Sequence, residues 1–332
     1  MEKIKLGIIG TGTIGRQAAA YLSTSANADL VAISDISEKQ GKEVAKAYKL
    51  NEYYKDYNEM LRKAPIDAVF IATPDFAHRE PLIACAKAGK SILVEKPLAT
   101  SIDEADMIVE AVEKYNVKLM VNYRMRWCPS YIEAKTQIDG GNLGDIVLAY
   151  AKKDDTISVS TEHIKWVEQT SPASFLSSHD IDAVRWLINS EASEVYAAGV
   201  SKVLRKRNIN TFDAIQALVK FKNGATTVFQ SSWIYPNTYP TTVDAVIQII
   251  GTQGTLIIDR VRTDMEIYLE NSSNFFNNAK VTTLPGSFSY FLNCVVNDEK
   301  PSPSAQEGRA IVEIVSAIHR SIESGSVIQI SG

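Results

Sequence analysis

The chain has 332 residues, and at about 150 residues per domain this length predicts two domains. Hydrophobic residues make up 45% and charged residues 22%, which excludes a disordered, collagen-like or coiled-coil chain. The net charge of −4 gives no basic field for nucleic acid, and no apolar run reaches the roughly 18 residues of a membrane span. We therefore expect a cytoplasmic globular protein that binds neither nucleic acid nor membrane.

The first apolar run, residues 4–9, meets glycines before it could form the core of a signal peptide. The three cysteines, Cys85, Cys128 and Cys294, are widely spaced, which predicts neither a disulfide framework nor a zinc site. The four histidines have no second His or Cys at ligand spacing. These counts predict a reducing compartment and no metal.

From residue 3 to about residue 121, short apolar runs alternate with longer amphipathic ones, which is typical of a doubly wound parallel sheet. The expected strands are residues 4–9, 30–34, 68–72, 91–94 and 118–121, and helical spacing covers residues 37–49 and 102–115. The sequence thus predicts an α/β domain over residues 1–122.

Beyond about residue 126 the pattern becomes rich in strands, and hairpin signals follow residues 221 and 250. The expected strands are residues 145–151, 194–203, 212–221, 225–233, 243–250 and 255–259. The expected helices are residues 130–138, 179–188 and 304–324. We predict an α+β domain over residues 123–332, with one large, mostly antiparallel open sheet.

A glycine-rich motif follows the first strand directly and opens a predicted helix. Its six residues are Gly10, Thr11, Gly12, Thr13, Ile14 and Gly15. In G-x-G-x-x-G, the glycines permit a tight turn and close approach of a pyrophosphate at the helix N-terminus. Asp35 ends the second strand, where its carboxylate would accept from ribose hydroxyls and repel a 2′-phosphate. The spacing therefore predicts NAD binding, with NADP less favoured; the alternative is that the glycines only shape a turn.

Two further loops follow strands at the carboxyl edge of the sheet, where ligands of such sheets bind. Thr73 and Pro74 follow one strand, and Glu95, Lys96 and Pro97 follow the next. A partly desolvated lysine beside a cofactor is suited to exchange a proton with a substrate hydroxyl. We assign these further residues to the cofactor site: Thr73, Pro74, His78, Glu95, Lys96 and Asn122.

The chain resembles the Gfo/Idh/MocA oxidoreductases, relatives of glucose-fructose oxidoreductase and inositol dehydrogenase, over nearly its whole length. The shared motifs are the glycine loop, Asp35, Glu95-Lys96-Pro97, Asn122, Arg126-x-x-Pro129 and His179-Asp180-Ile181-Asp182. The resemblance implies a Rossmann domain, a second domain whose open sheet mediates homodimers or homotetramers, and hydride transfer between NAD and a sugar or polyol.

The resemblance implies that Lys96 transfers the proton, that a cis peptide precedes Pro97, and that His179 assists on the substrate hydroxyl. Asp182 lies three residues after His179 on the same helix face, so it could orient the imidazole or bind a substrate hydroxyl. Many dehydrogenases of the family have an Asp four residues before this histidine, where this chain has Phe175. The usual set of Lys, Asp and His is thus incomplete.

The substrate side is expected to include Arg126, His163 and Trp166 beside Lys96, His179 and Asp182. Trp127, Trp233 and Tyr235 are further candidates, although aromatic residues in strands usually serve packing. Residues 156–174 form a polar stretch with weak periodicity, which suggests a lid or binding loop.

The preferred function is an NAD-dependent dehydrogenase that acts on CH–OH groups of a sugar, inositol or related polyol. Two alternatives remain: a redox-neutral hydrolase or lyase with tightly bound NAD, and a non-catalytic NAD-binding regulator.

Overall fold

The computed structural model describes residues 3–50, 52–259, 261, 264–269, 271–276 and 283–330. The chain forms two compact units, and each consists of two stretches of sequence. The first unit is Met1–Arg124 with Thr283–Arg309, and the second is Met125–Thr282 with Ala310–Gly332. The unit changes between Arg124 and Met125, and residues 283–309 group with the N-terminal unit, whereas the expected domains were the continuous stretches 1–122 and 123–332.

Aromatic packing explains why residues 283–309 belong to the first unit. The ring of Phe288 packs edge-on against that of Phe70, with 4.9 Å between centroids. The Tyr21 and Ser289 hydroxyls are 3.0 Å apart, and the Val121 N–H donates to the Pro303 carbonyl. The late segment thus covers part of the core that the early strands build.

The described part of the first unit has a six-stranded parallel sheet in the order β3-β2-β1-β4-β5-β6. Its strands are β1 (Ile4–Ile9), β2 (Ala28–Ser34), β3 (Tyr53–Tyr54), β4 (Ala68–Ile71), β5 (Ser91–Val94) and β6 (Leu119–Val121). Its helices are α1 (Thr13–Leu22), α2 (Glu38–Ala47), α3 (Tyr57–Lys63), α4 (Arg79–Lys87), α5 (Ile102–Lys114) and α8 (Leu284–Val296). This strand order is that of a dinucleotide-binding Rossmann sheet.

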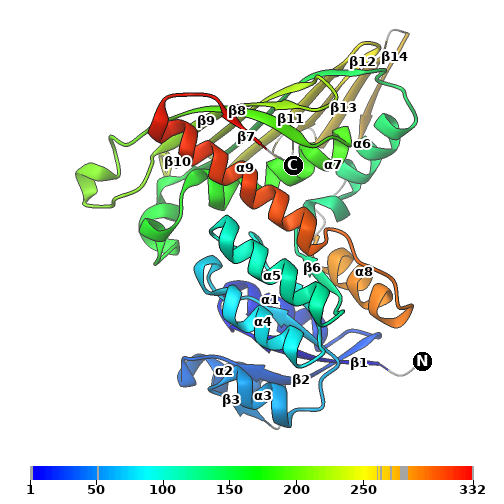
Figure 1. The fold of residues 1–332 in the computed structure, drawn as a ribbon, viewed down its shortest axis with the longest axis vertical. Helices are drawn as coiled ribbons and strands as arrows, with labels where there is room; N and C mark the ends of the chain where they lie inside the picture. The colour runs from blue at the N-terminus through cyan, green and yellow to red at the C-terminus, as the bar shows by residue number, and fades with distance from the viewer. Residues whose placement is uncertain are drawn as a thin grey trace. The chain divides into compact units, whose positions relative to one another are not determined.

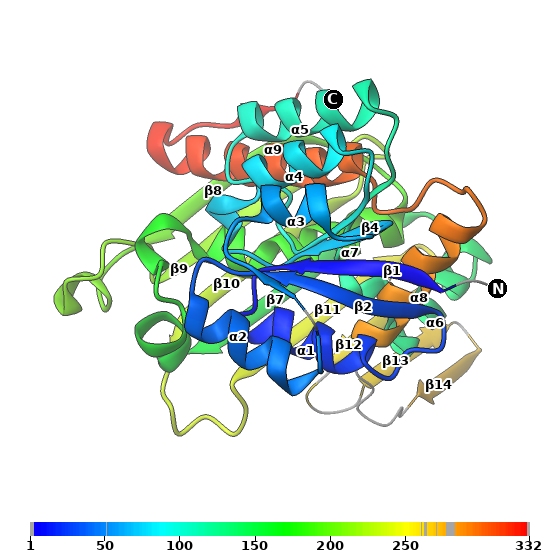
Figure 2. The ribbon, with the colours of Figure 1, turned by 90° about the horizontal axis from the view of Figure 1, so that it is seen from below.

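The described part of the second unit has a nine-stranded sheet in the order β14-β13-β12-β11-β7-β10-β9-β8-β15 (Figure 2). Among its described pairings, the β7–β10 pair is parallel and the others are antiparallel. Its strands are β7 (Ile146–Thr156), β8 (Ala192–Val200), β9 (Ala214–Phe221), β10 (Thr226–Tyr235), β11 (Val243–Gly251), β12 (Gly254–Asp259), β13 (Asp264–Leu269), β14 (Ser272–Phe276) and β15 (Ile328–Gln329). The predicted, mostly antiparallel sheet is confirmed.

One face of this sheet is covered by α6 (Pro129–Asp139) and α7 (Ser178–Ile188), as Figure 1 shows. Along β7 the side chains alternate: Ala149 and Ala151 are buried, whereas Leu148 is exposed on the other face. The last helix, α9 (Ala305–Ser324), begins in the first unit and ends in the second.

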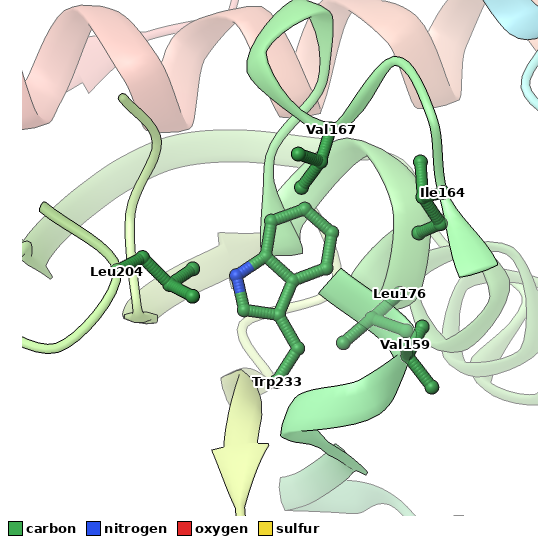
Figure 3. Close-up of a cluster of buried hydrophobic side chains, with 6 residues drawn as sticks. All are labelled: Val159, Ile164, Val167, Leu176, Leu204 and Trp233. Atoms are coloured by element: carbon green, nitrogen blue, oxygen red, sulfur yellow. The ribbon is translucent and has the colours of Figure 1, made fainter. Parts of the chain in front are cut away.

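The stretch 156–174 is anchored by an apolar cluster. It contains the short helical turns η3 (Val159–His163) and η4 (Val167–Gln169), and η5 (Ala173–Ser177) leads into α7. Figure 3 shows the cluster: Val159, Ile164, Val167, Leu176 and Leu204 surround the fully buried Trp233. These buried contacts anchor the stretch to the core of the second unit, and the lid or binding loop expected here stays a prediction.

Candidate active site

The three glycines of the loop after β1 have different surroundings. Gly10 has φ +92°, and a Cβ there would lie 2.7 Å from the Ala72 carbonyl oxygen. A Cβ on Gly15 would lie 2.0 Å from the Gly10 carbonyl oxygen. A Cβ on Gly12 would meet nothing within 4 Å. Gly10 and Gly15 therefore allow the turn and helix packing, whereas Gly12 borders open space at the N-terminus of α1.

Asp35 lies beside this loop, immediately after β2. One of its carboxylate oxygens, Oδ2, accepts from the Thr11 N–H at 2.7 Å and from the Thr11 hydroxyl at 2.6 Å. The other, Oδ1, accepts from the Ser37 N–H at 2.7 Å. A carboxylate has about four acceptor positions, and these three hydrogen bonds leave roughly one for a ribose hydroxyl. Rotation of the Thr11 hydroxyl would make a second position available. Thr11 and Ser37 thus hold the Asp35 carboxylate beside the glycine loop, and its contact with a ribose stays a prediction.

The loops after β4, β5 and β6 meet at the carboxyl edge of the first sheet. The Asn122 amide donates to Glu95 Oε1 at 2.7 Å, and the Asn122 N–H donates to the Val94 carbonyl. The Asn122 side chain is fully buried, and its Oδ1 has no hydrogen-bond partner among the described residues. Lys96 is half-buried, and the cis Lys96–Pro97 peptide implied by the resemblance is confirmed.

The ring of His78 connects the loop after β4 with the loop after β5. It is buried, with Nδ1 2.8 Å from the Pro97 carbonyl and Nε2 3.1 Å from the Thr73 carbonyl. Burial lowers the pKa of this imidazole, against the opposing effect of the Pro97 carbonyl. Both ring nitrogens face the protein, so His78 would contribute to a cofactor site through the loops it holds.

His179 lies in the first turn of α7, as predicted, and its side chain is half-buried. Phe175 precedes it in η5 and packs against the apolar cluster, 6.3 Å from Trp233 between ring centroids. The side chain at the position of the Asp that many family members have therefore packs against the apolar cluster around Trp233.

Asp182 and Arg126 form a buried ion pair with two contacts. Arg126 Nε donates to Asp182 Oδ2 at 3.0 Å, and a terminal nitrogen donates to Oδ1 at 2.6 Å. The two side chains are 6% and 0% exposed. We predicted substrate contact for Arg126, and for Asp182 contact with the imidazole or substrate. In the structure these two side chains bind one another and link η2 (Arg124–Trp127) to α7, and their contacts with substrate stay predictions.

The remaining predicted substrate residues do not share one environment. His163 is exposed, and Trp166 is half-buried at the apolar cluster with its indole N–H unpartnered among the described residues. Trp127 is half-buried. Trp233 is a core residue whose N–H donates to the Phe212 carbonyl, and Tyr235 donates to Asp154. The packing alternative is therefore confirmed for Trp233.

A second buried pair near His179 was not predicted. Lys153, on β7, contacts Asp180, the residue after His179, at 2.8 Å. The charged run from Lys152 to Asp155 resembles an exposed turn in sequence, so local pattern gave no signal for a buried strand end. Asp180 within the His-Asp-Ile-Asp motif was the one available indication.

In the described ranges, no group of three or more His, Cys, Asp or Glu side chains is arranged to bind a metal ion. Within the same part of the chain, the helices are all too short or too polar to cross a membrane. Two features of the first unit suit a dinucleotide. Gly12 borders open space at a helix N-terminus, where a phosphate can bind, and Asn122 Oδ1 at the same sheet edge can accept a hydrogen bond.

Two family models match the chain. Residues 4–123 match the oxidoreductase family with an NAD-binding Rossmann fold, and residues 131–257 match the GFO/IDH/MocA C-terminal domain.

Individual proteins agree with these matches. An uncharacterised oxidoreductase of Bacillus subtilis is 30% identical over 80% of this chain and 77% of its own length. The scyllo-inositol 2-dehydrogenase (NAD(+)) of the same organism is 28% identical over 99% and 97% of the two chains. The crystal structure of scyllo-inositol dehydrogenase from Lactobacillus casei, with NAD(H) and scyllo-inositol, has a TM-score of 0.86 at 23% identity and full coverage of both chains.

Proposed function

This chain belongs to the GFO/IDH/MocA family of oxidoreductases, and on that premise we propose that it is an NAD-dependent dehydrogenase of an inositol or closely related polyol. The observation that carries the proposal is the position of Lys96. This half-buried lysine follows β5 at the carboxyl edge of the first sheet, where Asn122 also lies. An amine at such an edge is suited to proton exchange with a hydroxyl.

The candidate site residues of the first unit have separate roles in this proposal. Gly12 and the N-terminus of α1 bind the pyrophosphate, and Asp35 accepts from the ribose and disfavours the 2′-phosphate of NADP. Lys96, in its neutral form, takes the proton of the substrate hydroxyl. The bound cofactor supplies the hydride acceptor that polyol oxidation requires.

His179 assists on the same hydroxyl in this proposal, and the pair of Arg126 and Asp182 supports the helix that carries it. Phe175 supplies no carboxylate for that step. Inositol is the first substrate to test, because the Bacillus subtilis relative is named for scyllo-inositol.

The test is the formation of reduced cofactor, followed at 340 nm, with NAD or NADP and a panel of inositols, aldoses and sugar acids. We expect turnover with NAD and an inositol. Lys96→Met should lower kcat by about 10²- to 10⁴-fold and leave the Kd of NAD within about twofold.

Lys90→Met is the matched control. Lys90 lies before the same strand, at the opposite end, and donates to the Ile66 carbonyl. It should retain the kcat of the wild type. Wild-type turnover in Lys96→Met, or NAD binding without turnover on any member of the panel, would contradict the proposal.

We also propose a homodimer or homotetramer formed through the second sheet. Leu148, Tyr196 and Leu218 are exposed on one face of it, at positions that alternate with buried alanines. Leu218→Glu should shift the sedimentation coefficient toward that of a monomer. A cytoplasmic location is supported by the three cysteines, which are free and buried.

A further inference from the structure

A buried ion pair joins the central strand β7 to the first turn of α7. Lys153 Nζ lies 2.8 Å from Asp180 Oδ1, and the two side chains are 9% and 2% exposed. Removing two charges from water is strongly unfavourable unless their geometry is good, so such a pair tolerates little displacement of either element. The pair therefore fixes the distance between β7 and the turn of α7 that contains His179.

A second buried pair holds the same turn from another direction. Asp182 is bound by Arg126, whose guanidinium also lies 5.7 Å from the centre of the Trp186 ring. At 3.6 residues per turn, Asp180 lies about 100° from His179 around the helix axis, and Asp182 lies about 60° from it on the other side. The two aspartates thus lie on either side of the His179 position around the helix axis, so holding both carboxylates resists rotation of this turn.

We propose that Lys153 is a positioning residue for His179, which acts by holding Asp180 and so fixes the rotation of the first turn of α7. The inference rests on the proposed function, in which His179 assists at the substrate hydroxyl. Small displacements of a catalytic group lower the rate strongly, since about 1 Å of misplacement costs on the order of 10²-fold.

The neighbouring residue of the same strand offers a comparison. Lys152 contacts Asp244 at 2.6 Å, and these side chains are 17% and 2% exposed. Asp244 lies on the adjacent strand β11, so this pair joins two strands of the sheet and leaves α7 untouched. Lys152→Met is therefore a matched control that removes a similar buried pair on the opposite face of the sheet.

The test compares kcat and KM for four variants with inositol as substrate. Lys153→Met should lower kcat by about tenfold to a hundredfold with an unchanged KM for NAD. Lys153→Arg should recover most of the loss, because it keeps the charge. Lys152→Met should keep the kcat of the wild type, although its melting temperature falls.

The double variant Lys153→Met with Asp180→Asn separates positioning from folding. Removing both charges of a buried pair is often neutral for stability, whereas removing one is not. We expect the double variant to melt near the wild type and still to have a kcat lowered by tenfold or more. Wild-type kcat in the double variant or in Lys153→Met, or an equal loss in Lys152→Met, would overturn the proposal.

A readout that needs no turnover distinguishes this proposal from the proposed function. The chain has four histidines, and the NMR signal of His179 is assigned by its loss in His179→Asn. Lys153→Met should shift or split that signal, and Lys152→Met should not. If His179→Asn retains full turnover, the proposed function is wrong at His179; an unmoved signal in Lys153→Met means that the positioning is wrong.

Discussion

The glycine loop allows cofactor binding to be separated from folding at a single position. Gly12 has φ −65° and ψ −163°, which is extended backbone that any residue adopts, and an added Cβ would meet nothing within 4 Å. Gly12→Ala should therefore fold without strain. Alanine reduces the conformational freedom of the unfolded chain, which stabilises by about 0.4–1 kcal/mol, but Gly12 is the N-cap of α1 and alanine caps a helix less well, so stability should stay within about 1 kcal/mol of the wild type.

The same methyl group would occupy the open space at the N-terminus of α1, where a pyrophosphate needs close approach to backbone N–H groups. A hydrogen bond to a charged group contributes about 1.5–3 kcal/mol. Losing one such bond raises the Kd by about tenfold to a hundredfold, at about 1.4 kcal/mol per tenfold. We expect a Kd for NAD raised by this factor in a protein whose stability stays within about 1 kcal/mol of the wild type.

Calorimetric titration with NAD and thermal unfolding without it measure the two quantities separately. Gly15→Ala is the control: its Cβ would lie 2.0 Å from the Gly10 carbonyl oxygen, so it should lose stability as well as affinity. If Gly12→Ala binds NAD within about twofold of the wild type, the pyrophosphate does not lie over Gly12, and the reasoning fails.

Three further predictions concern buried groups. Phe175→Asp would place a carboxylate at a half-buried position beside Trp233, so the free energy of unfolding from urea titration should fall by about 1–3 kcal/mol; an unchanged value would mean that Phe175 is not packed there. Burial lowers the pKa of His78, so below about pH 6.5 the unfolded chain binds a proton that the folded chain does not. The stability advantage of the wild type over His78→Asn should therefore shrink between pH 7.5 and pH 5.5, and a constant advantage would contradict it. Burial raises the pKa of Asp154, so the folded chain holds its proton to higher pH than the unfolded chain does. The urea midpoint of the wild type relative to Asp154→Asn should fall as pH rises from 4 to 8, and a rising difference would refute the assignment.

The sequence predicts the first sheet well because its strands are short apolar runs buried on both faces. Residues 91–94, for example, form β5 as expected. The end of β7 was missed, since a run of charged residues normally indicates a solvated turn. The strand continues to Thr156 because Lys152 and Lys153 find carboxylates far away in the sequence.

In the candidate site, too, local sequence patterns predict some features and miss those that depend on residues distant in the sequence. Motif spacing locates the glycine loop, Asp35 and Lys96, because their roles depend on the backbone path after a strand. The partners of His78 and Asp182 depend on side chains and carbonyls from other elements, which no local pattern encodes. Phe175 is the clearest example. The sequence shows that a carboxylate is missing at this position, but only the fold shows that the phenyl ring packs against the apolar cluster around Trp233.

The divided composition of the first unit has a consequence for its synthesis on the ribosome. Residues 283–309 complete this unit, and they emerge only after the 158 residues from 125 to 282 have been made. At about 5–20 residues per second this interval lasts about 10–30 s. During it the nascent sheet has no Phe288 to cover Phe70, so an apolar surface stays open while the strands of the second unit appear. Residues 283–309 complete the first unit, and residues 310–332 complete the second. Translation that stops before residue 283 therefore leaves both hydrophobic cores unfinished.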